Sequence, residues 1–239
     1  MRRVIIALLL VLVALAVTTA IVRQRPVAAE ISPNEQVMVD GTLRKFRQVV
    51  PHSLLDPAPV VFALHGIGDS PESMAGYSQL DRLAADNGFL LVYPAAHSAM
   101  WTSMQFDPDN LDANPDVIFF DRLLMNIAQR FSIDRDRIYV VGMSNGATFA
   151  QLLVAARSSE IAAVVAHSGS KPRGLLQPDI HRPLLLIVGD EDNESAAIQA
   201  DAAQYLADGH DVQLITVPGL AHEWSVRHNS LLWEFLSEH

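Results

Sequence analysis

The pentapeptide G-M-S-N-G at residues 142–146 constrains the fold of this chain more than any other feature. An apolar run at residues 138–141 precedes it, and a segment of helical character at residues 147–157 follows it. A strand, a tight turn and a helix in this order are the setting in which the serine of a G-x-S-x-G motif stands exposed above a sheet. The glycines let the strand and the helix pass close together, and the helix N-terminus directs N–H dipoles at a nearby anion. The pattern predicts that Ser144 is a nucleophile.

A glycine-rich turn of a nucleotide-binding fold is the alternative interpretation of the same five residues. A phosphate-binding loop would carry a lysine at a fixed spacing, and a dinucleotide-binding loop would show G-x-G-x-x-G. Neither pattern accompanies residues 142–146. The first interpretation is therefore favoured.

The charge of the chain excludes several classes of partner. Its 239 residues, a length typical of one domain, include 17 Lys and Arg against 27 Asp and Glu. Four of the arginines and none of the acidic residues precede Glu30, so residues 30–239 hold 13 basic and 27 acidic residues, a net charge of −14. Nucleic acids bind to clusters of Lys and Arg, so this excess of acidic residues argues against a nucleic-acid partner. The lack of cysteine excludes disulfides and thiolate metal sites.

The first 29 residues are typical of a targeting segment and not of a folded domain. Residues 1–3 form a basic start, residues 4–22 are almost wholly apolar, and residues 27–29 are small enough for cleavage before Glu30. The apolar run is near the minimum length that spans a bilayer. Two interpretations stay open: a cleaved secretory signal, or an uncleaved segment that tethers the protein to a membrane through residues 4–22. Both predict that the body, residues 30–239, is secreted or extracytoplasmic.

The body shows strand and helix patterns in alternation. Residues 30–34 are expected to be a linker, and residues 36–39 and 43–50 to be a hairpin around Asp40-Gly41, a pair that favours hairpin turns. Further strands are expected at residues 59–64, 89–93, 138–141, 161–166, 183–188 and 212–217, and helices at 78–87, 117–131, 147–157, 196–206 and 231–237. This alternation predicts an α/β fold, a mostly parallel sheet with helices on both faces.

Two loops after Ser144 carry candidates for the groups that would activate it. A serine hydroxyl needs a neighbouring base, and in the α/β-hydrolase arrangement the chain order is Ser, then Asp or Glu, then His. Asp190 and Asp192 follow the apolar run at residues 184–188, and His222 follows the run at residues 214–217. We expect His222 to take the serine proton and Asp192 to orient its ring, with Asp190 as the rival for that role.

Two other histidines also follow apolar strands. His65 precedes the serine in the chain and is expected to order the loop that it begins. His167 is expected to be a partly buried polar residue that makes a hydrogen bond.

Backbone donors and aromatic side chains complete the candidate site. Two N–H groups must meet the oxyanion of acyl transfer, and those of Asn145 and Ile67 are the candidates, although the loop of Ile67 also has the pattern of a simple turn. Trp101 and Trp224 are candidate walls of a substrate pocket, with core packing as the alternative for each.

Residues 133–147 closely resemble the family of secreted poly(3-hydroxybutyrate) depolymerases and feruloyl or acetylxylan esterases. Further stretches that are similar lie at residues 39–44, 49–51, 64–66, 116–120 and 219–224. The resemblance implies an α/β-hydrolase fold without a large lid domain, a triad of Ser144, Asp192 and His222, and oxyanion donors at Asn145 and Ile67. Many members carry cysteines, including one after the His-Gly pair, and this chain has none.

These observations together predict a serine hydrolase that cleaves carboxylic esters through an acyl-enzyme. No metal or organic cofactor is expected, and the substrate is expected to be a small or oligomeric ester. A serine peptidase that acts on short peptides and a non-catalytic binding protein on the same fold are the alternatives. The sequence leaves the natural ester and the oligomeric state open.

Overall fold

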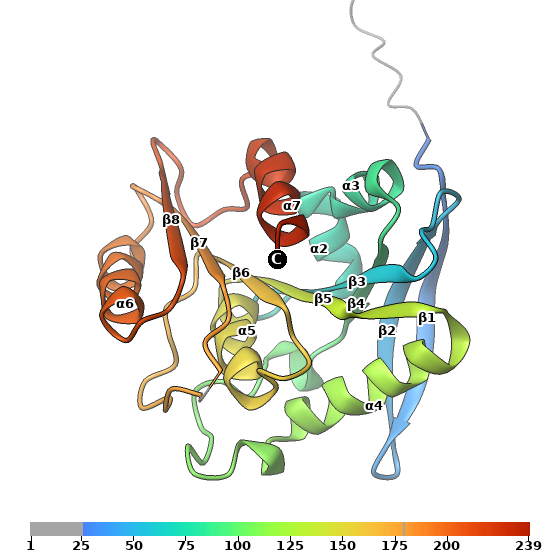
Figure 1. Ribbon diagram of the computed structural model, residues 1–239, viewed down its shortest axis with the longest axis horizontal. Coiled ribbons are helices and arrows are strands. Elements are labelled where there is room, and N and C mark those ends of the chain that lie inside the picture. The colour runs from blue at the N-terminus through green and yellow to red at the C-terminus, as the bar shows by residue number, and fades with distance from the viewer. Residues whose placement is uncertain (1–25, 179) are drawn as a thin grey trace, which may run out of the picture.

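In the part of the chain that the structure describes, eight strands form one central sheet (Figure 1). The computed structural model describes residues 26–178 and 180–239. Residues 1–25 of the targeting segment predicted at 1–29, which include its apolar run, lie outside the described residues. Within the described part of the chain, none of the helices combines the length and the apolar character needed to cross a membrane.

The strands follow the order β1-β2-β4-β3-β5-β6-β7-β8 across the sheet. β1 and β2 are antiparallel to each other, β2 is antiparallel to β4, and the remaining neighbours are parallel. The strands are β1 (Ala29–Val39), β2 (Thr42–Pro51), β3 (Ala58–Leu64), β4 (Leu90–Pro94), β5 (Ile133–Met143), β6 (Ala163–His167), β7 (Leu184–Gly189) and β8 (Val212–Val217).

The hairpin at the start of the sheet is confirmed, and it is longer than predicted. Asp40 and Gly41 both have positive φ, as the turn requires. The linker expected at residues 30–34 is wrong, because β1 already pairs with β2 from Ala29, which lies opposite Pro51. Backbone pairing at the edge of a sheet orders this polar segment, which has no apolar repeat to reveal it. The sheet therefore includes Ala29, which the boundary drawn at residue 30 left out.

Helices cover both faces of the sheet, as predicted. They are α2 (Pro71–Ser78), α3 (Leu80–Asn87), α4 (Pro115–Arg130), α5 (Asn145–Ala156), α6 (Ser195–Ala207) and α7 (Asn229–Ser237). α2 was not predicted, since its apolar residues show no helical repeat. Local signals still define its start, because the side chain of Ser70 accepts a hydrogen bond from the Ser73 N–H and Pro71 occupies the first turn.

In the described residues the core is made of two large clusters that share β3 and a smaller one where α6 packs on β7. Alternate residues of β3 divide between the two large clusters: Val60 and Phe62 pack with α4 and α5, whereas Val61 and Ala63 pack with α2, α3 and α7. Figure 1 shows α2, α3 and α7 above the sheet and α4 and α5 below it. The longest connection in the described residues, 95–114 between β4 and α4, carries two short 3-10 helices at His97–Ala99 and Leu111–Ala113.

The turn between β5 and α5 is packed more closely than any side chain would allow. A Cβ added at Gly142 would lie 2.3 Å from the Gly146 oxygen, and one added at Gly146 would lie 2.2 Å from the Leu64 oxygen. Backbone therefore touches backbone where β3, β5 and α5 meet. This contact fixes the start of α5 against the sheet.

Gly146→Ala should destabilise the protein because the added methyl group meets the backbone of β3. Forcing extra volume into a packed site typically costs ~1–3 kcal/mol, and we expect about 3 kcal/mol here, measured by urea unfolding. Gly76→Ala is the matched control, since a Cβ at Gly76 in α2 meets nothing within 4 Å. Equal unfolding free energies for the two variants would contradict this packing account.

Candidate active site

Ser144 occupies the turn at the carboxyl end of β5, the centre of the parallel part of the sheet. Its φ of 55° and ψ of −122° lie outside the regions that non-glycine residues ordinarily adopt. Its N–H donates to the His167 oxygen at 2.9 Å. A Cβ added at Gly169 would lie 2.4 Å from the Ser144 oxygen, so a second backbone segment presses on the turn. These contacts hold a strained conformation that turns the side chain out of the sheet.

His222 and Asp192 form a continuous hydrogen-bonded chain with Ser144. Ser144 Oγ lies 2.9 Å from His222 Nε2, and His222 Nδ1 lies 3.1 and 3.0 Å from the two carboxylate oxygens of Asp192. Asp192 follows β7 and His222 follows β8, so neighbouring parallel strands deliver both to the same edge of the sheet. The Asp192 side chain is fully buried, and that of His222 is 46% exposed.

The two aspartates of the loop after β7 have separate structural roles. Burial opposes ionisation of Asp192, but hydrogen bonds from the Glu194 N–H, His222 and Ser168 outweigh it and lower the pKa of the carboxyl group. The Asp190 carboxylate instead accepts from the Gly219 N–H at 2.6 Å. The structure thus places Asp192, and not its rival, beside the histidine. Asp190 holds the loop that carries His222.

His65 and His167 are buried beside the site and have structural partners, as predicted. His65 Nε2 accepts from the Ala96 N–H at 3.1 Å, so its Nδ1 donates to the Gly66 oxygen at 2.7 Å. His167 Nε2 accepts from the Ser225 N–H at 3.0 Å. Burial lowers the pKa of both rings, that of His167 to about 3, so both are neutral near pH 7.

The proposed backbone donors lie on the two segments that flank Ser144. Asn145 is the first residue of α5, and N–H groups of a first helical turn have no acceptor within the helix. A Cβ added at Gly66 would lie 3.5 Å from Ser144 Cβ, which brings the Gly66–Ile67 turn against the serine. The Ile67 side chain is 58% exposed. That the Asn145 and Ile67 N–H groups bind an oxyanion stays a prediction.

The two tryptophans differ in their positions. Trp101 is only 1% exposed, its ring stacks on Phe149, and its Nε1 donates to the His65 oxygen at 2.9 Å. The expectation that Trp101 forms a pocket wall is therefore wrong, because the ring is part of the core. Trp224 lines a cavity with Ser144, and its Nε1 donates to Asn229.

A polar network that the sequence did not reveal ties the loop after β4 to the site. The side chain of Asn145 accepts from the Trp101 N–H and donates to Ser103 Oγ, each at 2.8 Å. Asp116 accepts from the Thr102 N–H at 2.8 Å and pairs with Arg44. The hydrogen-bonded partners are up to 72 residues apart in the chain. The sequence shows only polar residues next to apolar ones at these positions, which does not reveal how they pair.

Two cavities flank the Ser144–His222 pair. One, of about 440 Å³, is lined by Gly66, Ile67, Asp69, Tyr77, Met143, Glu223 and Trp224 besides that pair. The other, of about 410 Å³, includes Ser103, Asn145, Thr148, Asp192 and Glu194. Neither lining contains Lys or Arg. Within the described residues, no three His, Asp or Glu side chains group to hold a metal ion.

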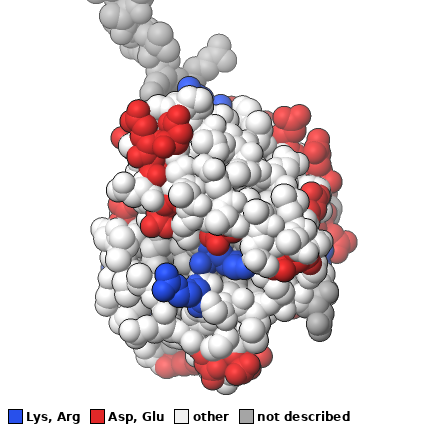
Figure 2. Space-filling model, turned by 90° about the vertical axis from the view of Figure 1, so that its left-hand side faces the viewer, with Lys and Arg blue, Asp and Glu red and all other residues white. Residues whose placement is uncertain are grey.

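The surface around the fold carries the acidic excess of the composition. Figure 2 shows one side of the molecule, where Asp and Glu side chains gather in several separate patches and Lys and Arg form one group in the lower half, with a few more near the top. This arrangement agrees with the net charge of −14 for residues 30–239.

Comparison with known proteins matches this chain to esterases. The family model described as esterase PHB depolymerase matches residues 46–174. Over 178 residues the chain is 30% identical to the putative esterase NocK of Nocardia uniformis subsp. tsuyamanensis, covering 72% of this chain and 52% of that protein. The chain spans about half or less of the length of the curated relatives that it matches.

Solved structures share the fold at low sequence identity. The acetyl xylan esterase from Aspergillus awamori aligns with a TM-score of 0.72 and 14% identity, covering 87% of this chain and 100% of that one. The fluorophosphonate-binding serine hydrolase F of Staphylococcus aureus aligns with a TM-score of 0.71 and 13% identity, covering 88% and 98%. The predicted α/β-hydrolase fold is confirmed.

His167 should make the stability of the fold depend on pH. Because the pKa of this ring falls to about 3 on folding, the unfolded chain binds a proton near pH 6.5 that the folded chain excludes. The contribution of the neutral His167 ring to the free energy of unfolding is complete above pH ~6.5. It is lost as the pH falls toward 3, and the free energy of unfolding then decreases by at most about 1.4 kcal/mol per pH unit. His167→Gln should flatten the loss of unfolding free energy between pH 7 and 4. Parallel curves for the two proteins would contradict a buried neutral ring.

Proposed function

Since the chain belongs to the esterase PHB depolymerase family, we propose that it is a serine hydrolase that cleaves carboxylic esters through an acyl-enzyme. The observation that carries the proposal is the unbroken chain from Ser144 Oγ through the His222 ring to the Asp192 carboxylate. This chain supplies a nucleophile, a base and an orienting group within hydrogen-bond reach of one another.

The geometry supports a definite sequence of proton transfers. Ser144 Oγ attacks the ester carbonyl carbon while its proton passes to His222 Nε2, and Asp192 stabilises the charged ring. The C–O bond to the alcohol then breaks, and His222 returns the proton to the leaving oxygen. Water, activated by His222 in the same way, attacks the acyl-serine and releases the carboxylic acid and free Ser144.

We assign the oxyanion of each tetrahedral intermediate to the N–H groups of Asn145 and Ile67. Such donors lower the barrier because they are already oriented before charge develops. The ties from the Asn145 side chain to Trp101 and Ser103 support this role for Asn145, since they restrict the start of α5.

The names of the relatives suggest the substrates to test first. They include acetylxylan and feruloyl esterases, so a panel of acetyl, feruloyl and 3-hydroxybutyrate esters, with matched amides, would define the substrate. Cleavage of amides in preference to esters would favour a serine peptidase, and failure to cleave any of them would favour a binding protein. We further propose that residues 1–29 direct the protein out of the cytoplasm and that the run at residues 4–22 either tethers it to the membrane or is cleaved off.

Ser144→Ala should abolish ester hydrolysis and leave the fold intact. Loss of a triad nucleophile typically lowers kcat by ~10⁴ to 10⁶. The test compares kcat/KM on 4-nitrophenyl acetate with that of Ser159→Ala, which changes an exposed serine beyond α5. Activity of the Ser144 variant within tenfold of the parent would refute the assignment.

Asp192→Asn should impair turnover far more than Asp190→Asn. An amide beside Nδ1 favours the wrong tautomer of the His222 ring, and the equivalent change in a serine protease lowers kcat by about 10⁴. Asp190→Asn removes the carboxylate that holds Gly219, so we expect a loss of about tenfold or less. The reverse order of kcat values would exchange the roles of the two aspartates.

A further inference from the structure

Beside Ser144 and His222 lies a cavity of about 440 Å³ whose lining combines aromatic rings with carboxylates. Tyr77 and Trp224 provide the rings, whose centroids are 6.5 Å apart, and Asp69 and Glu223 provide the carboxylates. We call it the Tyr77–Trp224 pocket. In the described part of the chain, neither carboxylate has an ion-pair partner.

Asp69 is the carboxylate that the fold places against the reacting centre. A Cβ added at Gly66 would lie 3.3 Å from Asp69 Oδ2 and 3.5 Å from Ser144 Cβ, so the carboxylate and the serine lie on two sides of one glycine. Asp69 Oδ1 accepts from Ser73 Oγ at 2.8 Å. Burial and the negative charge of Asp69 raise the pKa of the Tyr77 hydroxyl, so the carboxylate lies close to that hydroxyl. Ser73 and Tyr77 are both neutral, so neither balances the negative charge of Asp69.

A carboxylate in this position is unfavourable for the hydrolysis of a neutral ester. The tetrahedral intermediate carries a negative oxygen, and a like charge a few ångströms away opposes its formation. Positive charge on the substrate, placed between the two, would be attracted by both. A cationic substrate would offset the repulsion that Asp69 exerts on the negative intermediate.

The aromatic rings of the pocket suit the same kind of group. An ammonium ion is attracted to the face of Trp or Tyr. The Trp224 ring stacks on His167, with centroids 5.0 Å apart, and no Lys or Arg lines this pocket or the second one. Among the described residues, no protein cation thus occupies the place that a substrate cation would take.

We propose, on the basis of the proposed ester hydrolysis, that Asp69 together with Tyr77 and Trp224 selects esters that carry an ammonium group on the part of the substrate that enters this pocket. Asp69 is then a specificity-determining residue. The acidic surface of the protein adds to the selection, because a negative field raises the local concentration of cations and repels anionic esters.

The test compares two inhibitors of equal shape. Choline and 3,3-dimethylbutan-1-ol differ only in a positive nitrogen against a neutral carbon, and each is assayed against hydrolysis of 4-nitrophenyl acetate at low ionic strength. We expect the inhibition constant of choline to be about tenfold lower, in keeping with a cation–π contact and one unpaired carboxylate. Added salt should bring the two inhibition constants closer together, because it screens the charge of Asp69.

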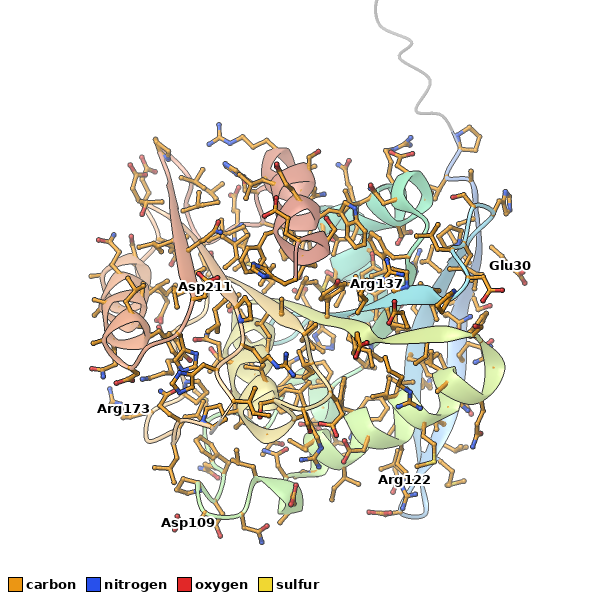
Figure 3. All side chains as sticks on the ribbon, in the orientation of Figure 1. Glu30, Asp109, Arg122, Arg137, Arg173 and Asp211 are labelled. Atoms are coloured by element: carbon orange, nitrogen blue, oxygen red, sulfur yellow. The ribbon has the colours of Figure 1, made fainter. Side chains whose placement is uncertain are left out.

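Asp69→Asn separates charge selection from a structural role. Its amide oxygen can still accept from Ser73, so the loop is preserved, but the ratio of the two inhibition constants should fall to within about twofold. Because the carboxylate opposes the negative intermediate, kcat/KM for the neutral ester should rise in this variant. Asp211→Asn is the matched control, because Asp211, labelled in Figure 3, precedes β8 at the end opposite to His222; its ratio should equal that of the parent.

Equal inhibition constants for the two alcohols in the parent would overturn the proposal while hydrolysis of 4-nitrophenyl acetate persists. A preference for choline that survives Asp69→Asn would also overturn it. If the parent does not hydrolyse 4-nitrophenyl acetate, or if Ser144→Ala hydrolyses it equally well, the proposed function is contradicted. The charge selection, which rests on that function, then falls with it. The three outcomes are distinguished within one set of assays.

Discussion

The contact between the Gly146 backbone and the Leu64 oxygen is the constraint on which the site depends. It allows α5 to start directly at the end of β5, so that Ser144 must take up a positive φ to join them. A larger residue would push the helix away from β3, and the loop after β3 would lose its place beside the serine. Gly142 and Gly169 add two further close approaches around the same residue. These close backbone contacts hold Ser144 in its strained conformation.

Buried polar side chains around this turn hold the neighbouring loops in place. The histidines among them are neutral, and the charged side chains form an ion pair. His65 and His167 each accept one backbone N–H, and burial lowers the pKa of both. The Arg44–Asp116 pair holds the segment that begins at Trp101. His222 is the exposed member of the chain that starts at Ser144, which suits a group that must meet a substrate.

The sequence predicted those features that depend on residues close together in the chain. It did not predict features that depend on packing between distant segments. Apolar runs revealed the inner strands, and Asp40-Gly41 revealed the hairpin turn, because both signals act over a few residues. The order Ser144, Asp192, His222 was predictable since parallel strands deliver their loops to one edge. Trp101 was assigned to a pocket wrongly, because stacking on Phe149 of α5 depends on packing between distant segments. The hydrogen bonds of the Asn145 side chain and the pairing of residues 29–32 with β2 escaped prediction for the same reason.

Covalent trapping tests the central claim that the turn makes Ser144 a nucleophile with His222 as its base. The protein is treated with an organophosphonate that resembles the tetrahedral intermediate, and peptide mass spectrometry locates the adduct. The account predicts one adduct per chain, on Ser144, with a labelling rate that collapses in His222→Gln. No adduct, an adduct on another serine, or equal labelling rates with and without His222 would contradict it.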